Sequence, residues 1–225
     1  MKTLNVELGA RRYPIYIGAG LFARPTVLRP HISGTRVVIV TNDGVAPLYL
    51  ERFSAGLASY QPLHIILPDG EQYKTLETTA SLYAQMVGAG LDRGSTVIAL
   101  GGGVVGDTAG FAAATFMRGV RLVQIPTSLL AMVDSSVGAK VGVDLPQGKN
   151  LVGAFKQPAL VLIDPDIVDT WEDDDSGTGT NARIVQTLDQ TGTWVIAANS
   201  RFGGETGSYT LKLACTGTSS QCSYS

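Results

Sequence analysis

Residues 96–107 have the sequence TVIALGGGVVGD, in which a β-branched apolar run passes directly into glycines. Such a run predicts a strand buried on both faces. Gly101, Gly103 and Gly106 fit the pattern G-x-G-x-x-G, and a small-residue helix is predicted to follow over 104–116. Glycines at a strand-to-helix turn let the backbone approach a pyrophosphate, and the helix N-terminus favours negative charge. A tight turn without a ligand explains the same glycines, so both interpretations stay open.

Strand and helix patterns alternate on either side of this turn. Further strands are predicted at residues 4–8, 13–17, 36–41, 63–67 and 120–125. Apolar residues at helical spacing predict helices over 45–59 and 76–87. The alternation argues for the α/β class, with a Rossmann-like parallel sheet and helices on both of its faces.

The pattern changes near residue 170, which predicts three parts. Residues 1–170 form the α/β domain, 171–181 form an acidic linker rich in Gly, Ser and Thr, and 182–225 form a short all-β segment with a small polar tail. The acidic run is interpreted as a solvated linker, with calcium binding as the alternative. Residues 173–214 resemble the last strands of a bacterial pre-peptidase C-terminal β-sandwich, a domain of secreted proteins. A chimera, a gene fusion or an assembly join explains such a combination.

Composition limits the classes of partner. The formal net charge is -2 for 225 residues, which argues against a general nucleic-acid or anionic-membrane binder. No apolar run reaches the roughly 18 residues of a membrane span, and the first residues lack the apolar region of a secretory signal. We therefore expect a cytoplasmic protein. Cys215 and Cys222 lie close together near the end of the chain, either as a disulfide or as two free thiols.

Several motifs in one order identify a family. The glycine run is followed by FMRG at 116–119, PTSLL at 126–130, VDSSVG at 133–138 and GKNL at 148–151. Together they resemble 3-dehydroquinate synthase, from residue 1 to about residue 170. The resemblance implies the conversion of DAHP, a seven-carbon sugar acid phosphate, to 3-dehydroquinate with elimination of phosphate, a step of the shikimate pathway. It also implies that this half binds NAD.

The resemblance implies a cofactor site near the glycine run. The residues implied at the pyrophosphate and the nicotinamide are Gly102, Gly103, Val104 and Asp107. Those implied elsewhere along NAD are Asn42, Glu71, Lys74, Thr127, Ser128, Lys149 and Thr170. Among them, Glu71 and Lys74 would contact the adenosine ribose. Without the resemblance, a solvated i,i+3 ion pair is the favoured interpretation of these two residues.

The catalytic residues that the resemblance implies face the substrate. Asp134 would bind the hydroxyl that is oxidised, Lys140 would neutralise the phosphate, and Asn150 would donate a hydrogen bond to it. Without the resemblance, Lys140 is an ordinary surface lysine. Arg118 is similar to the arginine that the family inserts into the phosphate site of a neighbouring subunit, which implies a homodimer. Ala139 departs from the family pattern, which has glycine there.

The family also uses a divalent metal, zinc or cobalt, held by one Glu and two His of a helical second domain. This chain has only His31 and His64, and neither has metal-ligand spacing. We therefore predict no metal ligands in this chain, and we expect it to be inactive alone. The alternatives are a non-catalytic dinucleotide-binding module, another sugar-phosphate cyclase, or an extracellular β module that carries an enzyme fragment.

Overall fold

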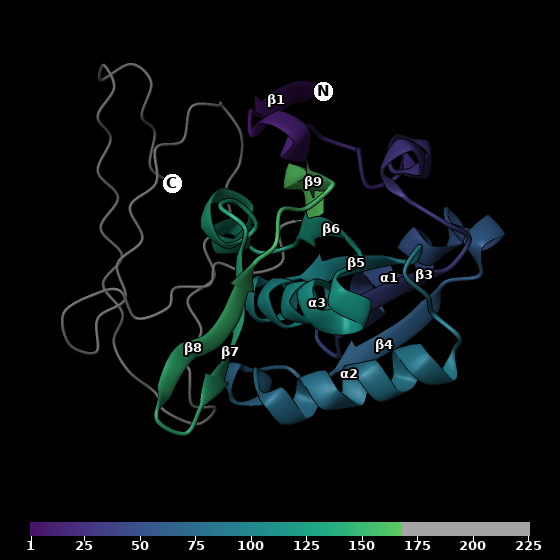
Figure 1. Ribbon diagram of the computed structural model, residues 1–225. Coiled ribbons are helices and arrows are strands. Elements are labelled where there is room, and N and C mark those ends of the chain that lie inside the picture. The colour runs from purple at the N-terminus through teal and green to yellow at the C-terminus, as the bar shows by residue number, and fades with distance from the viewer. Residues whose placement is uncertain (168–225) are drawn as a thin grey trace, which may run out of the picture. The chain divides into compact units, whose positions relative to one another are not determined.

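The computed structural model describes residues 1–167, and these form the predicted α/β fold (Figure 1). One sheet has the strand order β1-β2-β9-β6-β5-β3-β4, in which β1 and β2 are antiparallel and the other neighbours are parallel. Its strands are β1 Lys2–Val6, β2 Tyr13–Ile17, β3 Val37–Asn42, β4 Leu63–Leu67, β5 Thr96–Gly101, β6 Arg121–Pro126 and β9 Leu160–Ile163. The predicted linker, the β segment, the two cysteines and Thr170 lie outside the described residues.

Helices cover both faces of the sheet, as the sequence predicts (Figure 1). They are α1 Ala46–Ala55, α2 Leu76–Gly88 and α3 Gly103–Thr115. Side chains alternate along a strand, so Val38 and Val40 of β3 pack with α2 and α3, while Ile39 packs with α1 on the opposite face. Within residues 1–167, no helix is both long and apolar enough to cross a membrane.

The connections create a switch point between β3 and β5. From β3 the chain passes through α1 to β4 on one side, and from β5 it passes through α3 to β6 on the other side. In open parallel sheets, ligands bind outside the carboxyl ends of the strands at such a point. Asn42 ends β3 and Gly101 ends β5. The switch point therefore lies beside the glycine run.

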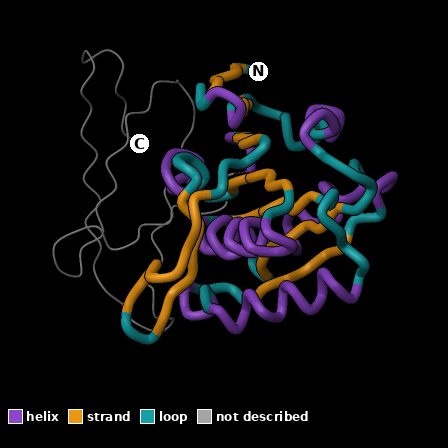
Figure 2. The backbone as a smooth tube through the Cα atoms, viewed as in Figure 1, coloured by secondary structure: helices purple, strands orange, loops and turns teal. Residues whose placement is uncertain are grey.

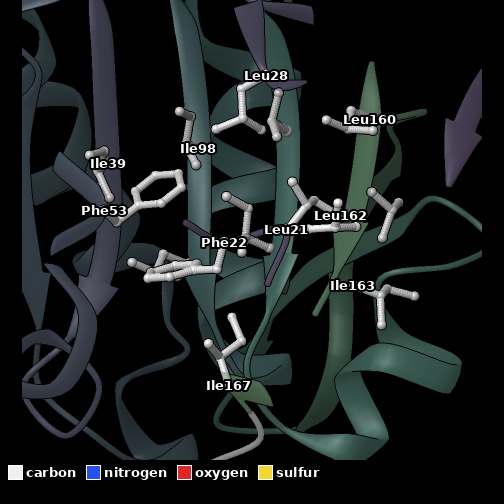
Figure 3. Packing of buried hydrophobic residues seen from close by; sticks show 14 of the residues in the cluster. Leu21, Phe22, Leu28, Ile39, Phe53, Ile98, Leu160, Leu162, Ile163 and Ile167 are labelled. Atoms are coloured by element: carbon white, nitrogen blue, oxygen red, sulfur yellow. The ribbon is translucent and has the colours of Figure 1, made fainter. Parts of the chain in front are cut away.

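The sheet face opposite α2 and α3 is covered in part by the segment that precedes β3, whose side chains Leu21, Phe22 and Leu28 pack on it (Figure 3). Phe22 stacks on Phe53 of α1, with 5.0 Å between the ring centroids. Asp164, which is 1% exposed, accepts hydrogen bonds from the backbone N–H groups of Gly20 and Phe22 at 3.1 and 2.8 Å. A buried carboxylate bonded in this way ties the segment before β3 to the end of β9.

A separate hairpin lies against α3 (Figure 2). It consists of β7 Lys140–Leu145 and β8 Gly148–Phe155, and Val141 and Val143 pack against Phe111 of α3. Neither strand was predicted from the sequence, and β9 was not predicted either. The predicted first strand began two residues late, and the predicted helix at 45–59 ran too far, because α1 ends before Gly56. Apolar Leu48 suggested a buried helix face, but its side chain is 58% exposed.

Replacing Gly110 by Ala should lower the free energy of unfolding by about 1–3 kcal/mol, because the added Cβ would collide with Val141 and the packed hairpin leaves little room to adjust. Gly88→Ala is the matched control in α2, where a Cβ meets no atom within 4 Å. It should stabilise by about 0.5–1 kcal/mol, because Ala loses less backbone entropy in a helix. Urea unfolding measures both values. Equal effects at the two sites would show that the hairpin does not constrain α3.

His31 should make stability depend on pH. Its Nε2 lies 3.2 Å from the Tyr16 hydroxyl, and its Nδ1 lies 3.0 Å from the carbonyl oxygen of Ala159. Burial lowers the pKa of His31, with a further lowering by Arg121, although the Ala159 carbonyl opposes it. The unfolded chain therefore binds the proton more tightly, and stability should fall as pH drops below about 6.5. Urea midpoints between pH 7.5 and 5 should fall less in His31→Gln than in the wild type, and parallel curves would contradict this.

Candidate active site

Lys74 is a buried cation beside the start of α3. It follows the turn Glu71–Tyr73, and its side chain is 5% exposed. Its Nζ lies 2.7 Å from Asp107 Oδ2 and donates a 2.7 Å hydrogen bond to Asn150 Oδ1. The ammonium is thus shared by α3 and the β7–β8 hairpin. The alternative of a solvated Glu71–Lys74 pair is wrong, because Lys74 is enclosed.

Glu71 and Lys149 form the outer edge of this cluster. Glu71 Oε1 lies 3.7 Å from Lys74 Nζ and 3.8 Å from Lys149 Nζ. Lys149 is half exposed, so its ion pair is weaker than the buried one. Four predicted cofactor residues and the predicted catalytic residue Asn150 therefore meet in one place. We call Glu71, Lys74, Asp107, Lys149 and Asn150 the lysine cluster.

The surroundings of Lys74 hold it in the charged state. Burial alone would lower the pKa of its ammonium, but Asp107, Glu71 and Asp144 together outweigh burial and raise the pKa. Burial raises the pKa of Asp107, and the Lys74 ammonium opposes that shift. A lysine with a raised pKa is a poor proton acceptor at neutral pH. Lys74 can therefore supply fixed positive charge and hydrogen bonds.

Asp144, which the sequence analysis missed, orients Asn150. Its Oδ1 accepts a 2.6 Å hydrogen bond from the Asn150 N–H, and its own N–H donates to the Lys74 carbonyl oxygen at 2.8 Å. Asn150 has φ +56°, a left-handed conformation that Asn tolerates better than most residues. The only sequence signal was one carboxylate within the apolar strand VGVDL. Asp144 joins the hairpin to the chain before α2 and so sets the position of the Asn150 amide.

The glycine run forms a close strand-to-helix turn. A Cβ on Gly101 would lie 2.7 Å from Val105 Cγ2, and one on Gly106 would lie 3.0 Å from Gln124 Oε1. Packing thus explains these two glycines, as the ligand-free interpretation expected. Gly102 is the N-cap of α3 and has no side chain to cap the helix. Gly103 and Val104 begin the helix, so this end carries positive dipole without a side-chain cap or an acidic residue in its first turn.

Buried polar residues flank the turn on both neighbouring strands. Thr127 and Ser128 follow β6 with exposures of 1% and 0%, and the Thr127 N–H donates to the Gly101 carbonyl oxygen at 3.1 Å. On the other side, Asn42 Nδ2 donates to Asp69 Oδ1 at 2.6 Å, and its Oδ1 accepts from the Val45 N–H at 2.9 Å. Asn42 therefore fixes the end of β3 at the switch point.

The family model and the curated relatives agree on one family. Residues 64–177, just over half of the chain, match the family model described as 3-dehydroquinate synthase N-terminal. The chain belongs to this family. The 3-dehydroquinate synthase of Pseudomonas entomophila strain L48 is 58% identical over 164 residues, covering 73% of this chain and 45% of that protein. The 3-dehydroquinate synthase of Hydrogenovibrio crunogenus is 51% identical over 179 residues, covering 80% and 50%. The chain spans about half the length of these relatives.

Solved structures share the fold of this 3-dehydroquinate synthase N-terminal domain. A 2-deoxy-scyllo-inosose synthase complexed with carbaglucose-6-phosphate, NAD⁺ and Co²⁺ has a TM-score of 0.69 and 28% identity, covering 74% of this chain and 46% of that one. ValA, a 2-epi-5-epi-valiolone synthase of Streptomyces hygroscopicus subsp. jinggangensis 5008 with NAD⁺ and Zn²⁺ bound, has a TM-score of 0.62 and 32% identity, with the same coverage. The Rossmann-like α/β fold class predicted from sequence is confirmed.

Two of the three catalytic residues predicted for this 3-dehydroquinate synthase N-terminal domain lie outside the lysine cluster. Asp134 is exposed in the π-helical turn Ala131–Ser135, and Lys140 is the exposed first residue of β7. In the described part of the chain, neither makes an ion pair or a side-chain hydrogen bond with the cluster. Ala139, before Lys140, is buried at φ +64°. This left-handed conformation explains the glycine of the family pattern, since Gly adopts it without cost.

Arg118 lies at the far end of α3 from the glycine run. It is exposed in the turn Phe116–Arg118, with φ +69°. From Asp107 of the cluster to Thr115, α3 rises about 12 Å at 1.5 Å per residue, and Arg118 lies three residues beyond. Arg118 therefore cannot reach the lysine cluster of its own chain.

The two histidines have structural partners. His64 Nε2 lies 2.7 Å from Ser54 Oγ, and His31 is bonded to Tyr16 and Ala159. Within residues 1–167, no three His, Cys, Asp or Glu side chains are grouped so that they could hold a metal ion. The residues of this part do not fit a zinc or cobalt site, and no chemical step is assigned to a metal here.

Proposed function

We propose that this chain is the NAD-binding half of a 3-dehydroquinate synthase, whose reaction converts DAHP to 3-dehydroquinate with elimination of phosphate. The lysine cluster beside the start of α3 carries this proposal, because it puts fixed charge next to a helix end whose N-cap is a glycine and whose dipole suits a pyrophosphate. Curated relatives above 50% identity favour this cyclase over the inosose and valiolone synthases, which are 28–32% identical. The cytoplasmic location expected from sequence belongs to the same proposal.

The proposed NAD site lies at the carboxyl ends of β3, β5 and β6, beside the lysine cluster. Gly102, Gly103 and Val104 would hold the pyrophosphate, and Asp107 would hold the nicotinamide end. Asn42, Glu71, Thr127, Ser128, Lys149 and Thr170 are proposed along the rest of the cofactor. When bound, NAD supplies a hydride acceptor. Lys74 orients Asp107 and Asn150 through its two hydrogen bonds and remains protonated.

The proposed substrate-binding residues are Asp134, Lys140 and Asn150, which the structure of this chain does not bring together. Asp134 would bind the hydroxyl, Lys140 and Asn150 would bind the phosphate, and the loop around Ala139 would have to bring Lys140 inward. We propose that Arg118 serves the phosphate site of a second copy, because about 12 Å of helix between Asp107 and Thr115 separates it from its own cluster. A homodimer follows from that proposal.

The chain alone should bind NAD without turning over DAHP. Calorimetric titration with NAD, followed by a phosphate-release assay with DAHP and added zinc, tests this. We expect saturable binding and no phosphate release, because residues 1–167 contain no group of side chains that could hold the metal ion on which the family's reaction depends. Phosphate release by the chain would show that it supplies metal ligands of its own. Absence of NAD binding by a chain that unfolds cooperatively in urea would overturn the proposal.

A further inference from the structure

A strongly basic cavity lies at the amino ends of the strands. Its volume is about 720 Å³, within the range of small-molecule sites. Five cationic side chains line it, namely Arg11, Arg12, Arg93, Arg121 and Lys156, and no carboxylate belongs to its lining. This concentration of charge is unusual in a chain whose formal net charge is -2.

The cations of this cavity are almost unpaired within residues 1–167. Arg12 forms an ion pair with Glu7 at 3.2 Å, but both side chains are more than half exposed, so the pair neutralises little charge. The salt bridges of the described part include none of the other four cations. Burial lowers the pKa of Lys156 and Arg121 lowers it further, and Arg121 also contributes to the lowered pKa of His31. The positive charge of Arg121 therefore lowers the pKa of two other groups that line the cavity, Lys156 and His31.

The cavity is distinct from the lysine cluster. Arg121 begins β6, and Arg12 immediately precedes β2, so the cavity lies at the amino ends of these parallel strands. The glycine run and Thr127 lie at the carboxyl ends. The six residues of β6 span about 20 Å at 3.3 Å per residue. A ligand in the cavity therefore does not compete directly with one at the start of α3.

We propose that this cavity binds a small phosphorylated molecule. Converging guanidinium groups bind phosphate oxygens through paired hydrogen bonds, and Lys156 adds a point charge. A concave site of this size in a chain of negative net charge favours a small molecule over a nucleic acid, which would need an extended basic surface. A phosphate ester and a free inorganic phosphate share this chemistry.

Pyrophosphate is the probe for the test, titrated into isotopically labelled chain at constant ionic strength. Amide shifts in the NMR spectrum should saturate at residues 119–122 and 156–159, with affinity at least tenfold weaker in Arg121→Gln/Lys156→Gln. The control Lys2→Gln/Arg24→Gln removes the same charge at exposed positions outside the cavity lining and should change affinity less than twofold. Urea midpoints of both variants show whether each is folded. Titration with ribose 5-phosphate then separates a phosphate ester from the free anion.

Three outcomes would overturn the proposal. Shifts confined to residues 102–104 would place the anion only at the helix start. Equal weakening in the two double variants would show that general charge attraction accounts for binding. Binding of a short single-stranded oligonucleotide more tightly than pyrophosphate, with the same dependence on Arg121, would assign the cavity to nucleic acid.

Discussion

Asp107→Asn should lower the free energy of unfolding by about 2–3 kcal/mol at neutral pH, measured from urea midpoints. The substitution keeps the size of the side chain but removes the anion 2.7 Å from a lysine that is 5% exposed. Breaking a buried pair on one side leaves an uncompensated charge, a cost of about 3–5 kcal/mol in general. We expect a smaller loss here because Asn150 and Glu71 remain as partners of Lys74.

The pH dependence of this effect has a definite sign. The folded state raises the pKa of Lys74, so the stabilisation from its charge is present below the usual lysine pKa and is lost as pH rises through the folded value. The deficit of Asp107→Asn should therefore shrink above about pH 10.5. An unchanged deficit at high pH would assign the loss to packing.

Two further variants isolate the cause. Glu51→Gln removes one exposed acidic charge from the middle of α1 and should change stability by less than about 0.5 kcal/mol. Adding Lys74→Met to Asp107→Asn should recover at least about 1 kcal/mol, because no buried ammonium then lacks its partner. A double variant less stable than Asp107→Asn alone would show that the ammonium is not the source of the cost.

The fold was predictable where the hydrophobic pattern is strong. Residues 96–100 and 63–67 are short apolar runs, and they form β5 and β4 close to the predicted limits. The hairpin was missed because its sequence mixes glycines and charged residues, and its burial depends on one helix, α3. Leu76 shows the opposite error, since it fits the helical pattern and is 45% exposed. Periodicity does not reveal which neighbour, if any, covers a side chain.

The sequence allowed the residues of the candidate site to be predicted, but not the contacts between them. The family resemblance indicated Lys74, Asp107 and Asn150, which lie far apart in sequence and meet beside the start of α3. Nothing in the sequence indicated that they share one buried ammonium, or that Asp144 holds Asn150 in place. These contacts depend on how the hairpin packs against α3. The hairpin can pack closely because Gly110 of α3 has no side chain that would collide with Val141, a contact between residues far apart in sequence.

Gly103→Asp should weaken NAD binding at least 100-fold while leaving the chain folded. Gly103 is the first residue of α3 and does not have a positive φ, so a side chain there is conformationally allowed. A carboxylate in the first turn interacts favourably with the helix dipole, by about 0.3–1 kcal/mol. The same charge would repel a pyrophosphate from the N–H groups that it needs. A 100-fold loss of affinity corresponds to about 2.7 kcal/mol of binding free energy.

Gly103→Asn is the matched control, because it has nearly the same shape without the charge. It should weaken NAD binding tenfold or less in calorimetric titration, and the gap between the two variants should narrow at high salt as the repulsion is screened. Equal losses in Asp and Asn would mean that side-chain size alone blocks the site. Wild-type affinity in both would mean that the pyrophosphate does not lie at the start of α3. If Gly103→Asp leaves the chain as stable as the wild type or more so, and yet weakens NAD binding, the start of α3 binds phosphate. If NAD binding does not change, the glycines there serve only the packing of the turn.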